Sequence, residues 1–501
     1  MGNKQIKYGA VISYGGLMIN IILSLIYTPW MVTQIGKSNY ALYTLATSFI
    51  SIFIMDFGLS SSVSRFVAKY RAEGSNNKIN IFVSTIFRLY IFVSLLIAIV
   101  LIILFFFLDK IYVGLTADEL STFRVLYIIV AINSIVSFPC MPFSGIISAY
   151  EKFIQLKFCE LFQKLFSVAL IVCALLLGMG VTAIVSAQVI SGFVTIAIKI
   201  FIIKKKINLK ISMRFFDKVV VKEAFSFSIW ITIISLAQRA IFNLAPTILG
   251  IVSTSEEIAI FSPANALEGY FYMFAAAVNG LFLPTISRYI AQNKENHISD
   301  LMIKIGRYQL VVLGLVLVGF LCAGKDFMCA WMGESFVMAW PCALLMFLPD
   351  YFLFSQQIAN TTITAKNKVK YQSLGYIGMG VICIIFSMIL CKRWGALGSG
   401  IAITISYFCL FVYMNIIYIR ILDLDMKRFY KECYGKLLIP IIIVGFVSFL
   451  ICSRINFESY WTNVIIKAMI TIIIYMVIIW KVITKEERDL ILKMLHVKKN
   501  A

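Results

Sequence analysis

Histidine is almost absent from this chain, which holds only His297 and His496 among its 501 residues. Histidine is the usual acid–base group and a common metal ligand near neutral pH. The glycine-rich loops that bind nucleotide phosphates and the cysteine spacings of zinc sites are missing as well. We therefore expect no metal, no cofactor, no ATP hydrolysis and no enzymatic activity in this chain.

Charge is scarce too. Asp, Glu, Lys and Arg make up 14% of the residues and hydrophobic residues 61%, whereas a soluble domain carries about 25% charged residues. The eleven cysteines are scattered and form no Cys-x-x-Cys pair. We interpret them as small residues of membrane helices, rather than as disulfides or metal ligands. This composition excludes an ordinary soluble protein.

The sequence consists largely of long apolar stretches. Fourteen of them run from Tyr8 to Ile483, and most have the roughly 20 residues that a helix needs to cross a bilayer core of about 30 Å. The predicted spans are 8–32, 39–63, 82–108, 122–149, 156–178, 181–203, 224–251, 258–286, 303–323, 337–363, 369–391, 395–419, 437–454 and 460–483. We therefore predict an all-α polytopic membrane protein with 14 transmembrane helices. The first span has no obvious cleavage site, so we expect no cleaved signal peptide.

The basic residues show how the chain is oriented. The formal net charge is +21, and most Lys and Arg residues lie at the N-terminus, in every second connection and in the tail. This bias predicts that both termini are cytoplasmic. No nucleic-acid partner is needed to explain it. The most basic connection, 204–223, either contacts anionic lipid headgroups or only anchors the topology.

An internal repeat predicts two lobes. SRFVA at 64–68 matches SRYIA at 287–291, and Arg88 matches Arg307 at nearly the same offset. Six helices per copy place both copies in the same orientation, as two parallel six-helix lobes with a cavity between them. The predicted parts are an N-terminal lobe 1–203, a basic linker 204–223, a C-terminal lobe 224–420, two C-terminal helices 437–483 and a tail 484–501. Because these two helices lie outside the repeat, we expect them to tolerate disturbance better than either lobe.

Ionisable residues inside spans are the candidates for a functional site, because each is costly near the bilayer centre. Arg239 lies near the midplane, beside Gln238 and one turn before Asn243. A guanidinium group matches phosphate oxygens with a planar set of donors. Two interpretations stay open: Arg239 with Asn243 binds a substrate phosphate, or Arg239 forms a structural ion pair with Glu268 or Asp350.

Glu160 and Lys164 are spaced four residues apart, with the acid first. This is the favourable order for an ion pair on one helix. A salt bridge is therefore the simpler interpretation, and substrate contact by Lys164 is the alternative.

Four further residues lie toward the ends of spans. Arg307 is close enough to the predicted cytoplasmic face to extend its side chain into the interface, and Arg88 could do the same or face the cavity. Arg124 lies nearer the outside. Asp56 ends a span close to Arg65, which predicts a structural pair or an ion site.

The 6+6+2 helix plan comes with several local features. They are Gly36, Tyr40, Asp56, Gly58, Leu59 and Arg65 within 35–68, the Trp331-Met332-Gly333 turn, and Gly395, Gly398 and Gly400 at the start of the twelfth span. Together they resemble a polysaccharide flippase of the O-antigen transporter type, within the multidrug, oligosaccharidyl-lipid and polysaccharide exporter superfamily. The plan of the helices carries more of this resemblance than any motif.

The resemblance implies a protein of the inner or plasma membrane that moves an undecaprenyl-diphosphate-linked oligosaccharide from the cytoplasmic to the outer leaflet by alternating access. It implies membrane lipids and polysaccharide polymerase machinery as partners. It also implies a cationic cavity, for which this chain offers Arg239, Arg88, Lys164 and Arg124. Glu268, Asp350, Asp56 and Glu160 remain candidates for ion coupling or ion pairs.

Three other functions fit the sequence less well. A multidrug exporter of the same superfamily has twelve spans as its common plan and often carries an acid in the first span, which this chain lacks. Resemblance to a lipid II flippase would call for arginines in that span, and it has none. A membrane scaffold or membrane-embedded transferase would leave the repeated lobes unexplained.

Overall fold

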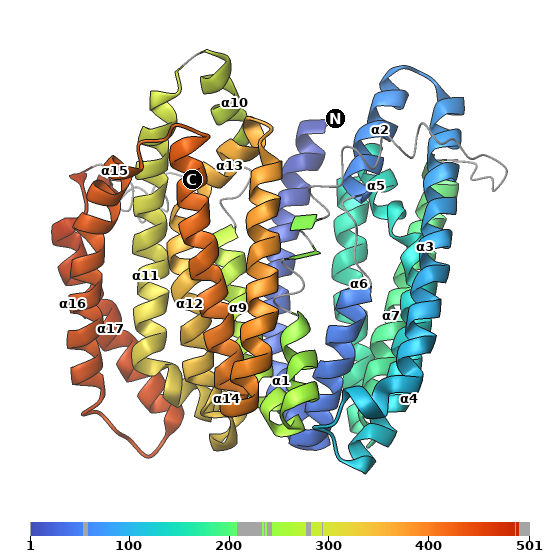
Figure 1. The fold of residues 1–501 in the computed structure, drawn as a ribbon, viewed down its shortest axis with the longest axis horizontal. Coiled ribbons are helices and arrows are strands. Elements are labelled where there is room, and N and C mark those ends of the chain that lie inside the picture. The colour runs from blue at the N-terminus through green and yellow to red at the C-terminus, as the bar shows by residue number, and fades with distance from the viewer. Residues whose placement is uncertain are drawn as a thin grey trace. The chain divides into compact units, whose positions relative to one another are not determined.

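The fold is that of a computed structural model. It describes residues 2–53, 59–207, 233–234, 236–237, 243–276, 282–292, 294–485 and 487–489. Helices dominate throughout (Figure 1), and no strand occurs among these residues. The chain forms two compact units. Unit 1 comprises residues 1–262 and 391–395, and unit 2 comprises 263–390 and 396–501.

Unit 1 is built from long helices joined by short connections. They are α1 (Gly2–Phe53), α2 (Leu59–Ala72), α3 (Asn76–Ile111), α4 (Ala117–Ser137), the 3₁₀ turn η1 (Phe138–Cys140), α5 (Pro142–Ala149), α6 (Phe153–Leu176), α7 (Val181–Ile202) and the π-helical turn η2 (Ile203–Ile207). The helical segment 243–252 and the start of α9 (Ser255–Ala276) also belong to this unit.

Unit 2 comprises the rest of α9 and the helices that follow it. They are α10 (Leu283–Ala291), α11 (Asn296–Met332), η3 (Glu334–Phe336), α12 (Ala339–Ser355), α13 (Gln357–Ala365), α14 (Val369–Arg420), α15 (Met426–Phe429), η4 (Tyr430–Tyr434), α16 (Gly435–Cys452) and α17 (Tyr460–Val482). Residues 391–395 of α14 belong to unit 1.

The apolar stretches of the sequence form these helices. Within the described part of the chain, nine helical segments are long and apolar enough to cross a membrane, so the protein is a multi-pass membrane protein. α1 and α14 each contain two predicted spans, and the backbone leaves the helical region only at Gly36 (φ 80°) and Gly395 (φ 51°). Positive φ is easily adopted only by glycine, so one residue replaces a loop. The count of 14 spans and the lobe boundaries stay predictions.

Proline interrupts the predicted fourth span. Pro139 lies in η1 and Pro142 begins α5, where a missing backbone N–H and a fixed φ end one helix and suit the start of another. The chain therefore turns between α4 and α5 and brings the side chains of α5 against α2.

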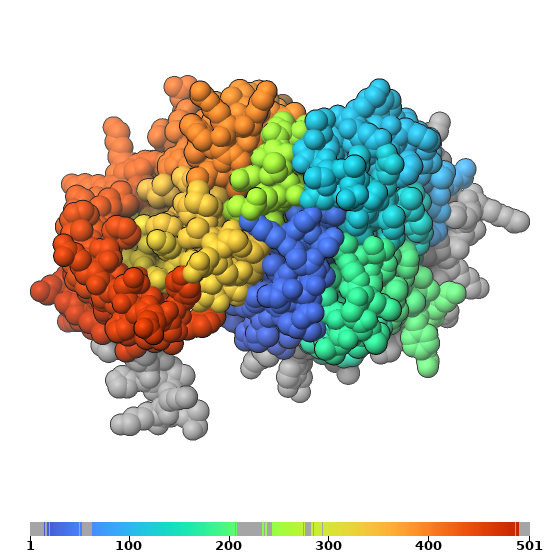
Figure 2. All heavy atoms as spheres, turned by 90° about the horizontal axis from the view of Figure 1, so that it is seen from below, coloured from blue at the N-terminus to red at the C-terminus, as the bar shows by residue number. Residues whose placement is uncertain are grey.

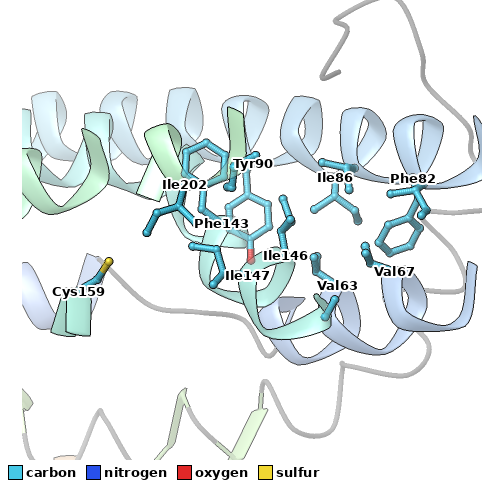
Figure 3. Packing of buried hydrophobic residues seen from close by; sticks show 14 of the residues in the cluster. Val63, Val67, Phe82, Ile86, Tyr90, Phe143, Ile146, Ile147, Cys159 and Ile202 are labelled. Atoms are coloured by element: carbon cyan, nitrogen blue, oxygen red, sulfur yellow. The ribbon is translucent and has the colours of Figure 1, made fainter. Parts of the chain in front are cut away.

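An apolar core lies at this end of unit 1. Figure 3 shows side chains of α2, α3, α5 and α7 meeting, among them Val67, Phe82, Phe143 and Ile202. Phe82 is 1% exposed and Val67 is fully buried. Burying side chains of this size stabilises by about 1.5–3 kcal/mol each. The core fixes α5 and the end of α7 relative to each other.

Two buried ion pairs hold the C-terminal helices in unit 2. α17 packs along α11 (Figure 1), and the Nζ of Lys467 lies 2.7 Å from an Oδ2 of Asp326 between these helices. Near the other end of α11, the Nε of Arg307 donates to Oε1 of Glu487 at 2.6 Å. The prediction that Arg307 extends to the interface is wrong, because it is 5% exposed and its partner follows α17. These contacts argue against the expectation that the last two helices are easily disturbed.

Candidate functional site

A polar pocket of about 690 Å³ lies inside unit 1. Its walls come from α4, the η1–α5 turn, α6 and α7, which together are apolar enough to cross the membrane. Three amide side chains line it: Asn133, Gln163 and Gln188. Five hydroxyl side chains line it as well: Ser137, Ser144, Ser167, Ser191 and Thr195. So many polar groups among membrane helices indicate a wet cavity.

Lys164 of α6 lines this pocket. It is one of the residues that the sequence proposes for substrate contact. Its Nζ donates to Oγ of Ser24 at 3.4 Å and lies 5.7 Å from the ring centroid of Tyr27, both on α1. The predicted ion pair between Glu160 and Lys164 is wrong. Glu160 accepts instead from Lys157 at 2.8 Å, because the Lys164 side chain turns toward α1.

Lys199 is a second cation in the pocket wall, and the sequence analysis missed it. It lies in the last turn of α7, and its Nζ donates to Oγ of Ser144 at 3.0 Å. The break between α4 and α5 places Ser144 opposite Lys199. A lysine at the end of a span is typical of an interfacial anchor, so its position in the sequence alone does not indicate a pocket residue.

A periodic signal for Lys199 was present in the sequence. Gln188, Ser191, Thr195 and Lys199 are spaced by three or four residues, so they share one face of α7. Gly192 lies on the same wall, where an added Cβ would come 3.9 Å from Nε2 of Gln163. This glycine therefore lies beside the amide groups of Gln163 and Asn133.

The charges of the pocket favour an anion. Lys164 and Lys199 bring two ammonium groups, and the one carboxylate in the lining, Glu160, is already paired with Lys157. The surrounding hydroxyl and amide groups supply donors and acceptors that replace water around a polar ligand. The arrangement suits a ligand that joins negative charge to many hydroxyl groups.

A second buried polar group lies in unit 2. Glu268 of α9 and Asp350 of α12 are each 2% exposed, and their side chains are hydrogen bonded to each other. A hydrogen bond between two carboxyl groups needs a proton on one of them, because ionised carboxylates only accept. Oδ2 of Asp350 has no hydrogen-bond partner among the described residues. The pair can therefore share one proton.

The other candidates lie elsewhere. Arg124 is exposed and pairs with Asp109 across α3 and α4, and Arg88 is exposed on α3. Asn243 is half-buried at the start of the helical segment 243–252. None of the three lines the pocket of unit 1.

Two candidate residues from the sequence, and the possibility of a metal site, are still to be placed. Arg239 and Asp56 lie outside the described residues. Across the part of the chain that the structure describes, no group of three or more His, Cys, Asp or Glu side chains is arranged to hold a metal ion.

Comparison with solved structures identifies the fold. A structure titled lipid II flippase MurJ, in an inward closed conformation, superposes with a TM-score of 0.71 at 15% identity, covering 97% of this chain and 99% of that one. A multidrug resistance MATE family transporter of the MOP superfamily, in an inward-facing conformation, gives 0.67 at 13% identity, covering 83% and 99%. The Vibrio cholerae MATE transporter VcmN gives 0.54 at 12%, covering 86% and 98%. These proteins are flippases and transporters rather than enzymes.

Sequence comparison assigns the family. None of the curated proteins compared matches this chain. The family described as polysaccharide biosynthesis protein matches residues 7–289, which is more than half of the chain. Together with the fold, this match confirms the resemblance drawn from the sequence. The chain belongs to the polysaccharide biosynthesis protein family.

Proposed function

We propose that this protein is a flippase for an undecaprenyl-diphosphate-linked oligosaccharide, which it moves from the cytoplasmic to the outer leaflet by alternating access of two six-helix lobes. In this proposal it has 14 spans, lies in the inner or plasma membrane with both termini cytoplasmic, and supplies polysaccharide polymerase machinery. The observation that carries the proposal is the pocket of unit 1, with Lys164 and Lys199 among hydroxyl and amide groups.

The pocket answers the physical problem of this substrate. A diphosphate and its sugars lose strong hydration on entering hydrocarbon, which costs several kcal/mol for each unpaired polar group. Two ammonium groups neutralise the phosphates, and the hydroxyl and amide side chains exchange hydrogen bonds with the sugars. The lipid tail has no such cost and stays in the bilayer.

The position of the pocket fits loading from the cytoplasm. Lys164 lies in the half of α6 that the charge bias predicts to be cytoplasmic, and Lys199 lies near the predicted cytoplasmic end of α7. A substrate assembled in the cytoplasm would meet this pocket first. Arg239, Arg88, Arg124 and Asn243 remain proposed contacts elsewhere on the path.

The carboxyl pair of unit 2 offers a means of coupling. Glu268 and Asp350 share one hydrogen bond and are buried, so binding or loss of one cation changes the charge of a buried site. We assign this pair the role of coupling-ion site. For Asp56 and Glu160 the same role is kept as the alternative to structural pairing.

A multidrug exporter is the second candidate, and the fold of the MATE transporters favours it. Organic cations, the typical substrates of a cation exporter, need acidic or aromatic side chains in their binding site. Lys164 and Lys199 in the pocket of unit 1 repel an organic cation instead. The pocket therefore favours an anionic substrate.

The test is transport by the purified protein in lipid vesicles. Fluorescent lipid-linked oligosaccharide is added to one leaflet, and its arrival in the other is followed by quenching. We expect Lys164→Gln/Lys199→Gln to lose most of the flipping, because the pocket keeps its shape but loses its charge. Lys205→Gln is the matched control, since Lys205 is exposed beyond the end of α7. Unchanged flipping by the double variant, or transport of a cationic dye instead, contradicts the proposal.

A further inference from the structure

We propose that a small set of contacts between residues 243–262 and the α1 and α3–α4 region forms a latch that closes the outer end of the transport path. The latch goes beyond the proposed function, on which it rests, because it assigns a conformational role to residues far from the pocket. Its members are Lys37, Ser38, Thr44, Gly114, Glu119, and residues 253–262.

The location of these contacts is the first argument. Residues 243–262 belong to the predicted second lobe, yet in the structure they are part of unit 1, and the chain passes into unit 2 at Pro263. Pro263 lies inside α9, where it removes a backbone hydrogen bond and permits bending. Residues 243–262 of the predicted second lobe thus pack with residues of the predicted first lobe, and alternating access of the two lobes requires such contacts to open.

Charged and polar groups form the surface layer of the latch. The Nζ of Lys37, just after the bend of α1 at Gly36, lies 2.6 Å from Oε1 of Glu256 in the first turn of α9. Glu119 accepts hydrogen bonds from Ser38 of α1 and Ser255 of α9. One carboxylate therefore joins both helices to α4.

Glu119 is held in position by its own helix. Its Oε2 accepts from the backbone N–H of Thr116 at 2.9 Å, and its backbone N–H donates to Oγ1 of Thr116, so the two residues form a capping box at the start of α4. A carboxylate fixed in this way accepts from Ser38 and Ser255 with little loss of side-chain entropy.

Close backbone packing forms the next layer. A Cβ added to Gly114 would come 1.7 Å from the carbonyl oxygen of Ser253, and one added to Gly250 would come 3.0 Å from the ring of Tyr112. Figure 2 views this side, where lime-green atoms of the segment near residue 250 lie against cyan atoms of the α3–α4 region and near blue atoms of α1. Glycine at 114 is required for this approach.

The deepest contact is between two hydroxyl groups. Oγ of Ser262 donates to Oγ1 of Thr44 at 2.8 Å, joining α9 to α1 one residue before Pro263. All these contacts lie at the end of the helices that the charge bias predicts to be outside. Exposed ion pairs and single hydrogen bonds are individually weak, which suits a closure that must open in every cycle.

A disulfide across the deepest contact tests whether the latch must open. In Thr44→Cys/Ser262→Cys the two sulfur atoms replace hydroxyl oxygens 2.8 Å apart, close enough for a bond after small side-chain rotation. We expect an oxidant to stop flipping in this variant and a reductant to restore it. The single variants Thr44→Cys and Ser262→Cys report any effect of the eleven native cysteines. If fully cross-linked protein flips lipid as fast as the same protein does after treatment with the reductant, the latch is overturned.

A second measurement does not depend on transport. Gly114→Ala forces its contact with Ser253 apart, and Glu119→Gln weakens the surface layer without adding volume. A cysteine placed at Ser262, which is 7% exposed in the closed latch, should then react faster with a membrane-impermeant maleimide added from outside. Gly180→Ala is the matched control, because a Cβ there meets nothing within 4 Å. Equal labelling in all variants contradicts the latch. Increased labelling in a protein that flips no lipid-linked sugar supports the latch and contradicts the proposed function.

Discussion

The buried pair between Arg307 and Glu487 provides the sharpest test of how unit 2 is held together. The Arg307 guanidinium donates to both carboxylate oxygens of Glu487, at 2.6 and 2.9 Å, and its Nη1 donates to the backbone carbonyl of Glu432 at 2.7 Å. Both side chains of the pair are less than a tenth exposed. Glu487→Ala leaves a buried guanidinium with only one of these partners.

The expected loss of stability is large. Removing one partner of a buried ion pair costs about 3–5 kcal/mol, which is between about a hundredfold and a few thousandfold in the unfolding equilibrium at about 1.4 kcal/mol per tenfold. Glu432→Gln is the matched control. The Glu432 side chain pairs with Arg428 at the surface, where such a pair is worth at most about 1 kcal/mol, and its backbone carbonyl stays in place.

The assay is thermal unfolding of the detergent-solubilised protein, followed by size-exclusion chromatography of a fluorescent fusion. Glu487→Ala should unfold well below the wild type and Glu432→Gln close to it. Arg307→Met/Glu487→Met should recover much of the loss, because neither buried charge remains. If Glu487→Ala and Glu432→Gln unfold at the same temperature as the wild type, the pair does not hold the segment after α17 in place.

The same pair predicts a pH dependence. Burial raises the pKa of Glu487, but hydrogen bonds from Arg307 and Thr484 outweigh it and hold the pKa below the ordinary value of 4.5. A carboxyl whose pKa is lower in the folded state stabilises above its unfolded pKa and loses that effect as pH falls through the folded one. Acidification below about 4.5 should therefore destabilise the wild type more than Glu487→Gln in the thermal assay.

Three further outcomes are expected. Lys467→Met should lower the unfolding temperature by leaving Asp326 buried without its partner, and Lys467→Met/Asp326→Leu should regain part of it; equal unfolding of single variant and wild type refutes this. A cysteine at Asp118 should react with an impermeant maleimide in intact cells and one at Lys210 should not, with the reverse pattern contradicting the topology. Arg239→Ala should abolish flipping in inserted protein and Arg239→Lys restore only part; normal flipping by Arg239→Ala refutes a substrate role.

The helices could be predicted because lipid imposes a simple rule on the chain, and apolar length alone marks a span. The joins at Gly36 and Gly395 could not be predicted. The sequence suggests a loop between successive spans, whereas in the structure a single glycine separates the two helical halves of α1 and of α14. For the candidate site, Lys164 was found from its depth in a span. Lys199 was not, because its role depends on Ser144, 55 residues away.

Partner choice was the least predictable feature. Lys157 lies three residues before Glu160 and Lys164 four residues after it, and helix geometry permits an ion pair with either lysine. Only the packing of α6 against α1 directs Lys164 away. Arg307 pairs with a residue 180 positions later in the chain, a distance at which neither periodicity nor spacing carries information.

The joins at Gly36 and Gly395 also restrict how this chain can change in length during evolution. Most loops absorb insertions, because added residues extend into solvent. Here a helix follows the glycine immediately, so one inserted residue rotates everything after it by about 100° about the helix axis. In α14 that rotation would turn the face of Thr404, whose hydroxyl donates to the carbonyl of Leu345 at 2.6 Å, away from α12. Descendants of this sequence should therefore gain and lose residues in their longer connections while keeping these two joins at constant length.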